Sequence, residues 1–468
     1  MRTRRAYDVV VVGGGTAGAI AGIAAARTGA RTLVVEQYGS LGGVLTLGMS
    51  LKGVDDGGGA RALGGIGAEL IAGARRIGGA TLVSHHPRHG SIMGQDPEAM
   101  KLTLMEMVRD SGLGLLLHAF LVDAVMDGTR IAAIRVAHKG GLESIPAQCF
   151  VDCTGDADLA ARAGARFALG REGDGHLQPV SSIFRVGGVE LDATWAYLAQ
   201  HPEDLETPLG DAADVGGEYA ADAFRAKPGV GVEGFRTLVA KARAAGDYHI
   251  PRDKFGFNPL PGRREVTINI TRVHGIDGTD PDDLTRAEVE TQLQTLEAVR
   301  FLRKYVPGFA ECYVVSSPFQ VGVRETRRIE GGYVLTKDDV LAGRDFPDQV
   351  ARGAYPLDIH DVGRDATVLG AKVGGSGVTL WRLDRSYGIP ARCLVPQGVD
   401  NLVVAGRCLS ATHEAAGSAR GQPVCMATGH AAGTIGALSA LGRVAPADLA
   451  TERLRTTLLR QDAVLERT

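Results

Sequence analysis

The chain has no block of like charge and no long run of apolar residues. Its 51 lysine and arginine residues are balanced by 54 aspartate and glutamate residues, which leaves a formal net charge of -3. Neither nucleic acid nor an anionic membrane surface is therefore an expected partner. No apolar run approaches the roughly 18 residues that cross a bilayer, so we also expect no membrane span.

Cysteine pairs and metal-type spacings are missing as well. Six cysteines are scattered along the chain without a Cys-x-x-Cys or zinc-type pattern, namely Cys149, Cys153, Cys312, Cys393, Cys408 and Cys425. Such a distribution predicts buried, reduced thiols rather than disulfides. We therefore expect a cytoplasmic protein without a bound metal.

The most informative feature that is present lies in the first 36 residues. A predicted strand over 7–12 runs into Gly13, Gly15 and Gly18 of a Gly-x-Gly-x-x-Gly turn, and an alanine-rich helix then leads to a second strand ending at Glu36. The first glycine permits a tight turn, the second lets the backbone approach a pyrophosphate, and the third lets helix and strand pack closely. The helix N-terminus attracts phosphates, and the acid can accept hydrogen bonds from a ribose diol. The pattern predicts a dinucleotide site.

The length of the chain predicts more than one structural unit. A chain of 468 residues exceeds a single compact core, and the stretch between about 170 and 390 contains more proline, aspartate and arginine than its flanks. We predict an α/β fold in which residues 1–170 and 390–468 form a Rossmann-type nucleotide-binding domain, with a parallel sheet and an antiparallel meander. Residues 171–389 are predicted to be an inserted, mixed α+β substrate domain.

Local patterns place elements within the nucleotide-binding unit. A helix is expected over 97–111, an antiparallel meander over 115–136 and a strand over 148–152. A last parallel strand is expected over 401–406, followed by a helix over 423–441.

The inserted unit is predicted to mix strands with one long helix. Strand-like runs occur at 180–187, 265–270 and 312–323, and Thr285 with Glu288 has the spacing of a capping box at the helix start. An apolar stripe follows and is expected to pack in the core, formed by Val289, Leu293, Leu296, Val299, Leu302 and Val306.

Three further stretches carry a resemblance to a known family: 323–328, 355–361 and 405–413. With the N-terminal fingerprint and the Thr154-Gly155-Asp156 turn, they resemble the FAD-dependent oxidoreductases of the glutathione-reductase-like superfamily. More narrowly, the chain is similar to the bacterial FAD-dependent oxidoreductase family that carries a fused insert domain. The resemblance covers nearly the whole chain and implies the cofactor FAD, but it says little about the substrate.

The resemblance also implies where FAD is held. In the superfamily, the Gly42-Gly43 loop runs beside the ribityl chain and pyrophosphate, and the Thr154-Gly155 turn closes over the cofactor. The last helix points its N-terminus at the pyrimidine edge of the flavin, where it stabilises the negative charge of the reduced ring. The expected FAD-binding residues are Gly13, Gly15, Thr16, Ala17, Gly18, Glu36, Gln37, Gly42, Gly43, Val44, Thr154, Gly155, Gly406, Arg407, Gln422 and Pro423.

Three arginines and two histidines are candidates for the chemistry. Arg324, Arg327 and Arg328 can bind a carboxylate or polarise a carbonyl, but ion pairs with nearby glutamates are the alternative, so we expect at most one to act. His360 lies between two aspartates that could hold its tautomer and raise its pKa, although a histidine satisfied in a turn is equally compatible. His413 follows a segment that the superfamily places near the isoalloxazine. The predicted catalytic residues are Arg324, His360 and His413.

Two polar stretches are expected to be loops near the active site. His85, His86 and His89 lie in a Pro/Gly-rich segment and are predicted to form a flexible loop rather than a metal site. Residues 55–59 read Asp-Asp-Gly-Gly-Gly, which predicts a mobile loop that can act as a lid.

Absent motifs narrow the chemistry. The loop after Glu36 contains no redox cysteine pair, and it contains no histidine that would attach the flavin covalently. The glycines at 373–377 lack the strand-turn-helix context of a second nucleotide site, so any nicotinamide is expected to bind transiently.

We therefore expect hydride transfer between non-covalently bound FAD and a small polar organic substrate that is anchored by Arg324 or Arg407. The electron acceptor and a homo-oligomeric state stay open. Three alternatives also stay open: an oxidase or monooxygenase that uses O2, a non-redox transferase or lyase that contains FAD, and a nucleotide-sensing module.

Overall fold

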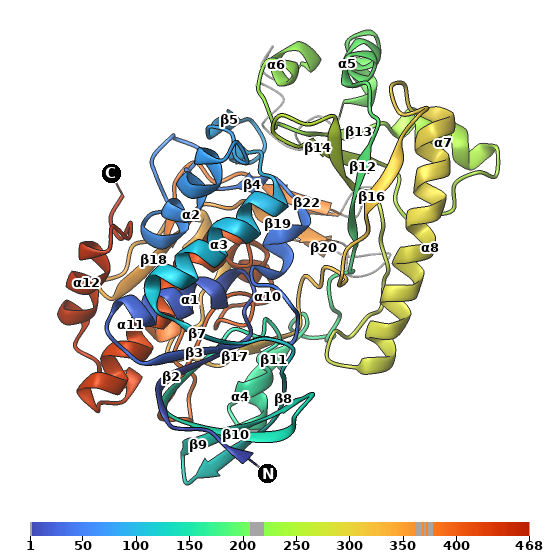
Figure 1. The fold of residues 1–468 in the computed structure, drawn as a ribbon. Helices are drawn as coiled ribbons and strands as arrows, with labels where there is room; N and C mark the ends of the chain where they lie inside the picture. Colours follow the sequence, from blue (N-terminus) through green and yellow to red (C-terminus); the bar gives the residue numbers. More distant parts are fainter. Residues whose placement is uncertain (1, 206–219, 361–366, 369–370, 373–377, 468) are drawn as a thin grey trace.

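The computed structural model describes residues 2–205, 220–360, 367–368, 371–372 and 378–467. A body built on a large sheet carries both ends of the chain, and a second sheet with one long helix packed along it lies beside that body (Figure 1).

Strand β10 (Gly141–Asp152) joins the two halves of the eight-stranded main sheet. Its second half pairs in parallel with β2 and β24, whereas its first half pairs antiparallel with β9, so the predicted parallel sheet and meander form one continuous surface. The run at 115–117 contributes to β7, which pairs in parallel with β3 instead of joining the meander, and this corrects one expectation. The other strands are β1 (Arg2–Thr3), β2 (Tyr7–Val12), β3 (Thr32–Val35), β7 (Gly114–Leu116), β8 (Phe120–Asp127), β9 (Arg130–His138) and β24 (Leu402–Val404).

Both faces of the parallel part are covered, which explains why its strands are apolar without interruption. Along β2, Val9 and Val11 join the core beneath the helices, while Val10 and Val12 join a second core with the meander and α4 (Asp158–Arg162). The helices on the first face are α1 (Thr16–Arg27), α2 (Gly65–Arg76), α3 (Pro97–Ser111), α11 (Gln422–Gly442) and α12 (Thr451–Arg460). The helices predicted over 97–111 and 423–441 are thus present.

Helices α1 and α11 approach each other at backbone distance. A Cβ atom added at Gly429 would lie 2.3 Å from the carbonyl oxygen of Ala17, and one added at Gly433 would lie 2.0 Å from that of Ala21. Because real side chains cannot occupy such space, glycine is required at both positions.

Helix α11 bears on the expectation about membrane spans. It is the one helix, within the described part of the chain, that is long and apolar enough to cross a bilayer by length and composition, and the expected absence of a membrane span stays a prediction. In the structure 89% of its most apolar window is buried, as it is in core helices that pass the same test.

The second sheet is antiparallel and has five strands in the order β13-β14-β15-β12-β16. It carries its own core, in which aromatic side chains such as Phe184, Phe257 and Phe301 meet. The strand predicted over 312–323 is confined to β16. The elements of this region are β12 (Ile183–Gly187), α5 (Leu191–Gln200), α6 (Ala221–Arg225), β13 (Val232–Gly234), α7 (Arg236–Ala244), β14 (Phe255–Pro259), β15 (Glu265–Asn269), α8 (Pro281–Tyr305) and β16 (Tyr313–Ser316).

Helix α8 differs from its prediction in two ways. It is capped by Asp280, whose side chain accepts from the backbone of two residues in the first turn, while Thr285 lies inside the helix and donates to the Pro281 carbonyl. Val289, Leu293 and Leu296 are 54%, 61% and 57% exposed, so the first half of the stripe is not core. The second half, with Leu302 and Val306, is buried as expected.

The remaining segments form short elements around the main body. Residues between Leu335 and Ile389 contribute to the same core as α1 and α11, while the domain boundaries at 170 and 390 stay predictions. These elements are β4 (Leu51–Lys52), β5 (Ser84–His86), β6 (Gly90–Met93), β11 (Phe167–Leu169), β17 (Arg327–Ile329), α9 (Lys337–Leu341), β18 (Gln349–Gly353), β19 (Leu357–His360), β20 (Thr367–Val368), β21 (Ala371–Lys372), β22 (Val378–Trp381), β23 (Tyr387–Pro390) and α10 (His413–Ala419).

The close packing of α1 against α11 makes a testable prediction. Replacing Gly433→Ala forces a methyl group against the Ala21 carbonyl, so we expect a loss of about 1–3 kcal/mol in the free energy of unfolding. Gly442→Ala at the end of α11 is the control, because its Cβ would meet no atom closer than 3.6 Å. Urea unfolding of both variants measures the difference, and equal stabilities would contradict the packing described.

Candidate active site

The glycine-rich turn has the geometry that its sequence predicts. Gly13 has a φ of 89° and donates from its N–H to the Val35 carbonyl at 2.8 Å. A Cβ at Gly18 would lie 1.8 Å from the Gly13 carbonyl oxygen, whereas a Cβ at Gly15 would meet no atom within 4 Å. The third glycine thus serves packing, and the second faces open space at the start of α1.

Glu36 holds this turn from the end of β3. Its carboxylate accepts from the Gly14 N–H at 2.6 Å and from the Tyr38 N–H at 2.8 Å, and burial raises its pKa. Each carboxylate oxygen has a second lone pair, so the expected contact with a ribose diol stays a prediction. Gln37, the next residue, is exposed.

The loop that contains Gly42 and Gly43 folds back over the turn. Thr16 donates from its hydroxyl to the Gly42 carbonyl at 3.1 Å, and the Gly42 N–H donates to the Gly14 carbonyl at 2.8 Å. The side chain of Gln422 then donates to the Val44 carbonyl at 3.1 Å. These contacts bring the loop, the start of α1 and the start of α11 together.

The Thr154-Gly155 turn meets the segment after β24. Gly155 has a φ of 84°, and a Cβ there would lie 2.6 Å from the Arg407 guanidinium. Arg407 donates to Asp156 at 2.9 Å, and Gly406 faces Ala17 at the start of α1. All the expected FAD-binding residues except exposed Gln37 therefore lie around one turn system.

The residues present fit an FAD molecule. Helix α1 begins after Gly15 and α11 begins after Gly421, and neither N-terminus is capped by a side chain. Pro423 occupies the first turn of α11, where its missing N–H leaves nothing unpaired. Free N–H groups at both helix starts, together with open space at Gly15, suit a diphosphate at one end and the flavin pyrimidine at the other.

A cavity that is partly open to solvent lies between this cofactor region and the second sheet. Among the described residues that line it, the basic side chains outnumber the acidic ones six to two. The basic residues are Lys52, Arg88, Arg252, Arg324, Arg407 and Arg420, the acidic ones are Glu233 and Asp358, and Val44, Gly421 and Gln422 connect the cavity to the cofactor region.

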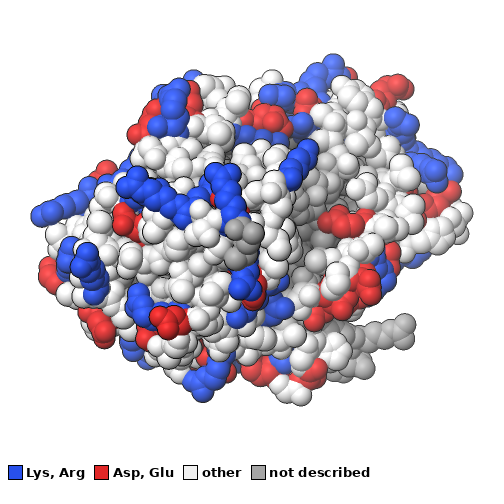
Figure 2. Space-filling model, turned by 60° about the horizontal axis from the view of Figure 1, so that its bottom comes forward, with Lys and Arg blue, Asp and Glu red and all other residues white. Residues whose placement is uncertain are grey.

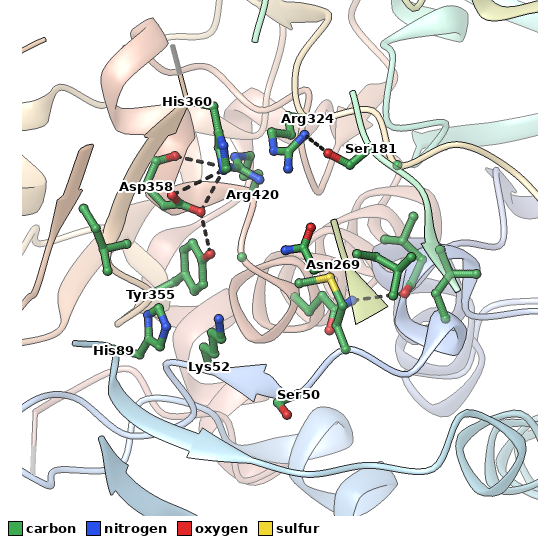
Figure 3. A pocket seen from close by; sticks show the side chains of 18 of the residues that line it. Ser50, Lys52, His89, Ser181, Asn269, Arg324, Tyr355, Asp358, His360 and Arg420 are labelled. Carbon is green, nitrogen blue, oxygen red and sulfur yellow. Dashed lines mark hydrogen bonds and ion pairs between the residues drawn. The ribbon is translucent and has the colours of Figure 1, made fainter. Parts of the chain in front are cut away.

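Arg324 is the arginine of its cluster that reaches this cavity. It donates to the Pro179 carbonyl and to the Ser181 hydroxyl, the latter at 2.9 Å (Figure 3). Burial, with Arg420 and Arg272 nearby, lowers the pKa of its guanidinium well below the usual value. Arg327 pairs with Asp158 and Arg328 with Glu325, away from the cavity lining.

His360 lies at the end of β19 and lines the cavity, but its ionisation differs from the prediction. Its Nδ1 accepts from Arg272 at 3.1 Å, and its Nε2 lies 3.4 Å from an oxygen of Asp358. Burial and the nearby Arg324 guanidinium lower its pKa well below the usual range, so the expected upward shift is wrong. Asp361, the second aspartate invoked, lies outside the described residues.

His413 does not line this cavity, and its catalytic role stays a prediction. It starts α10, where its Nδ1 lies 2.8 Å from an oxygen of Glu325 in a buried cluster with Arg328. The same glutamate thus holds both an arginine and a histidine that the sequence offered as candidates.

The two expected loops are ordered by specific contacts. Within residues 55–59, Asp56 accepts from the backbone of Gly58 and Ala60 and from that of Ser386, which makes a fixed turn rather than a free lid. The three histidines belong to the β5–β6 hairpin. His86 and His89 are buried and stacked with ring centroids 4.7 Å apart, and His89 lines the cavity.

Sequence reasoning missed several cavity residues. Lys52, Arg252, Tyr355 and Arg420 all line it, and none belongs to a motif that marks chemistry by itself. Tyr355 begins the stretch 355–361 that carries the family resemblance, but no role was predicted for it. The glycines at 373–377, which were predicted not to form a second nucleotide site, lie outside the described residues.

Comparison with known proteins identifies the class. Residues 8–458 match the family described as FAD dependent oxidoreductase, and the chain belongs to this family. It is an FAD-dependent oxidoreductase enzyme with an α/β FAD-binding fold.

Several solved structures are similar to this chain. They include the myxobacterial chondrochloren halogenase CndH (11% identity over 98% of this chain and 79% of that one, TM-score 0.45). A second is the p-nitrophenol 4-monooxygenase PnpA from Pseudomonas putida DLL-E4 (11% identity over 98% of this chain and 84% of that one, TM-score 0.45). A third is a geranylgeranyl bacteriochlorophyll reductase-like protein from Thermoplasma acidophilum (12% identity over 98% of this chain and 86% of that one, TM-score 0.43). At these values no reaction or substrate carries over to this chain.

The contrast between two glycines tests the cofactor site. Gly15→Ala places a methyl group in open space where the diphosphate is expected, so the apoprotein should keep its stability while FAD affinity falls about tenfold or more, that is by at least about 1.4 kcal/mol. Gly18→Ala collides with the Gly13 carbonyl and should destabilise the fold itself. FAD titration and thermal unfolding of both apoproteins separate the effects, and unchanged FAD binding by Gly15→Ala would refute the placement.

Proposed function

We propose that this enzyme is a dehydrogenase or reductase that moves a hydride between FAD and a small organic substrate bearing a carboxylate. One observation carries the proposal: the cavity next to the cofactor residues has six basic and two acidic side chains. The bound flavin supplies the hydride acceptor or donor. The residues of the cavity bind and orient the substrate.

The charges of the cavity favour an anionic ligand. Both acidic residues are already engaged, since Glu233 faces Arg88 and Lys254 at 3.5 and 3.6 Å, and Asp358 accepts from Arg420. Crowded cations in a partly buried site destabilise the protein unless an anion joins them. A substrate carboxylate would offset that cost.

Arg324 is placed to bind that carboxylate. Its side chain is fixed by Ser181 and the Pro179 carbonyl, so its guanidinium loses little freedom when it forms a further pair. Arg420 is held by Asp358, which also accepts from the Tyr355 hydroxyl at 2.8 Å. This network keeps Arg420, Tyr355 and His360 in place at the cavity wall (Figure 3).

The cysteines support the predicted compartment. All six are free and buried, as in proteins of reducing compartments, and we propose a cytoplasmic location on this basis. On the face shown in Figure 2, basic and acidic residues are mixed rather than gathered by sign.

Anaerobic titration tests the proposed reaction. The oxidised holoenzyme is mixed with a panel of hydroxy, amino and saturated carboxylic acids, and bleaching of the flavin absorbance is recorded. We expect bleaching by at least one acid and none by its amide or ester. Bleaching by neutral alcohols alone, or dependence on O2 with a nicotinamide as the reductant, would overturn the proposal in favour of another flavin reaction.

Arg324→Met tests the anchor. Loss of a charge-assisted pair costs about 1.5–3 kcal/mol, so the Kd of the carboxylate substrate should rise roughly 10- to 150-fold while the FAD content stays unchanged. Arg327→Met is the matched control, because its guanidinium pairs with Asp158 outside the cavity. An equal Kd in both variants would remove Arg324 from the anchor role.

A further inference from the structure

Lys52 differs from the other basic residues of the cavity. It ends β4, lines the cavity and points into it near His89 and Tyr355 (Figure 3). Within the described residues, no hydrogen bond or ion pair holds its ammonium group. The five arginines, in contrast, each have a partner, namely Glu233, Asn269, Ser181, Asp156 and Asp358 for Arg88, Arg252, Arg324, Arg407 and Arg420.

The charges around Lys52 come from four segments. Glu233 on β13 and Asp358 on β19 attract the ammonium group, whereas Arg88 and Arg252 repel it. His86 and His89 of the neighbouring hairpin also face it, and burial with the Lys52 charge lowers the pKa of both rings well below the usual range. The two acids, which are also paired with other cations, each act on the lysine charge more strongly than either arginine, but burial is the largest influence.

This environment shifts the protonation equilibrium of Lys52 toward the neutral amine. Burial lowers the pKa of the Lys52 ammonium group, with Arg88 and Arg252 acting in the same direction and Glu233 and Asp358 opposing them. A neutral amine has a lone pair that faces the cavity and no competing partner. Lysines desolvated in this way are suited to proton transfer near neutral pH.

We propose that Lys52 Nζ is the group that accepts the substrate proton during dehydrogenation and returns it during reduction. The inference rests on the proposed function. For a hydroxy acid, the C–H electron pair leaves as hydride to the flavin, the hydroxyl proton moves to the Nζ lone pair, and the C–O bond becomes C=O. The lysine is neutral before the step and charged after it, and the flavin is reduced by two electrons.

The neighbouring candidates are less suited to this role. His360 has both ring nitrogens engaged, one by Arg272 and the other by Asp358. Tyr355 donates its hydroxyl proton to Asp358, and burial raises its pKa well above the usual value. Lys52 has neither constraint.

Chemical labelling tests the amine without a substrate. The holoenzyme is acetylated briefly over a pH series, and modification of each lysine is quantified by mass spectrometry of one digest. We expect Lys52 to reach half of its maximal reactivity at a lower pH than the exposed lysines. A midpoint equal to theirs or higher would overturn the proposal, whatever the substrate proves to be.

Two substitutions test the step itself. Lys52→Met and Lys52→Arg should both slow flavin reduction about 10²- to 10⁴-fold, because methionine has no basic group and arginine stays protonated and cannot accept a proton at working pH. The rise of the reduction rate with pH should disappear in both. Lys227→Met is the control, since that lysine bonds to the His85 carbonyl and does not line the cavity.

The outcomes separate this proposal from the proposed function. Suppose that carboxylates bleach the wild-type protein and that Lys52→Arg is reduced at the same rate. Lys52 would then supply only charge, and the proposal would be overturned. A rise in Kd without a fall in reduction rate would mean the same. If no carboxylate bleaches the wild type, the proposed function fails, and the labelling midpoint alone then decides whether Lys52 is a neutral base.

Discussion

The contact between the backbones of α1 and α11 is the constraint on which the active site depends. Gly429 and Gly433 let α11 lie directly on the carbonyls of Ala17 and Ala21, and Gly18 lets α1 lie on the turn at Gly13. Two uncapped helix starts are thereby fixed near each other, one where we expect the diphosphate and one where we expect the flavin. The Gln422 bond to Val44 then ties the second helix start to the loop that covers the first.

The cavity follows from this arrangement and from the second sheet. Its cofactor side is made by the start of α11 and the loop at Val44, and its far side by β12, β13 and β15. Two acids are shared among many bases, and each acid is used to orient a neighbour rather than to neutralise the cavity. The resulting excess of positive charge is costly in the absence of a ligand, and it would give the proposed anionic substrate both affinity and orientation.

The sequence predicts local features better than distant ones. The fingerprint, the strand at β24 and the helix α11 were predictable because each depends on consecutive residues with a fixed spacing. The stripe on α8 was misassigned since periodicity shows that a helix has an apolar face but not what covers it, and Val289 and Leu293 are exposed. The contact of His413 with Glu325 was not predictable, because the two residues lie 88 positions apart in the chain. Lys52 carries no motif, and its character arises only from the charges that folding brings around it.

The central claim is that the cationic cavity presents carboxylates to the flavin, and difference spectroscopy tests it most directly. A carboxylate that is not oxidised is titrated into the oxidised holoenzyme while the visible flavin spectrum is recorded. The account predicts a saturable shift of the flavin bands in the wild type. In Arg324→Met the carboxylate Kd obtained from this shift should rise at least tenfold, which corresponds to about 1.4 kcal/mol or more. A flavin spectrum that does not respond to any carboxylate, or that responds equally in the variant, would contradict it.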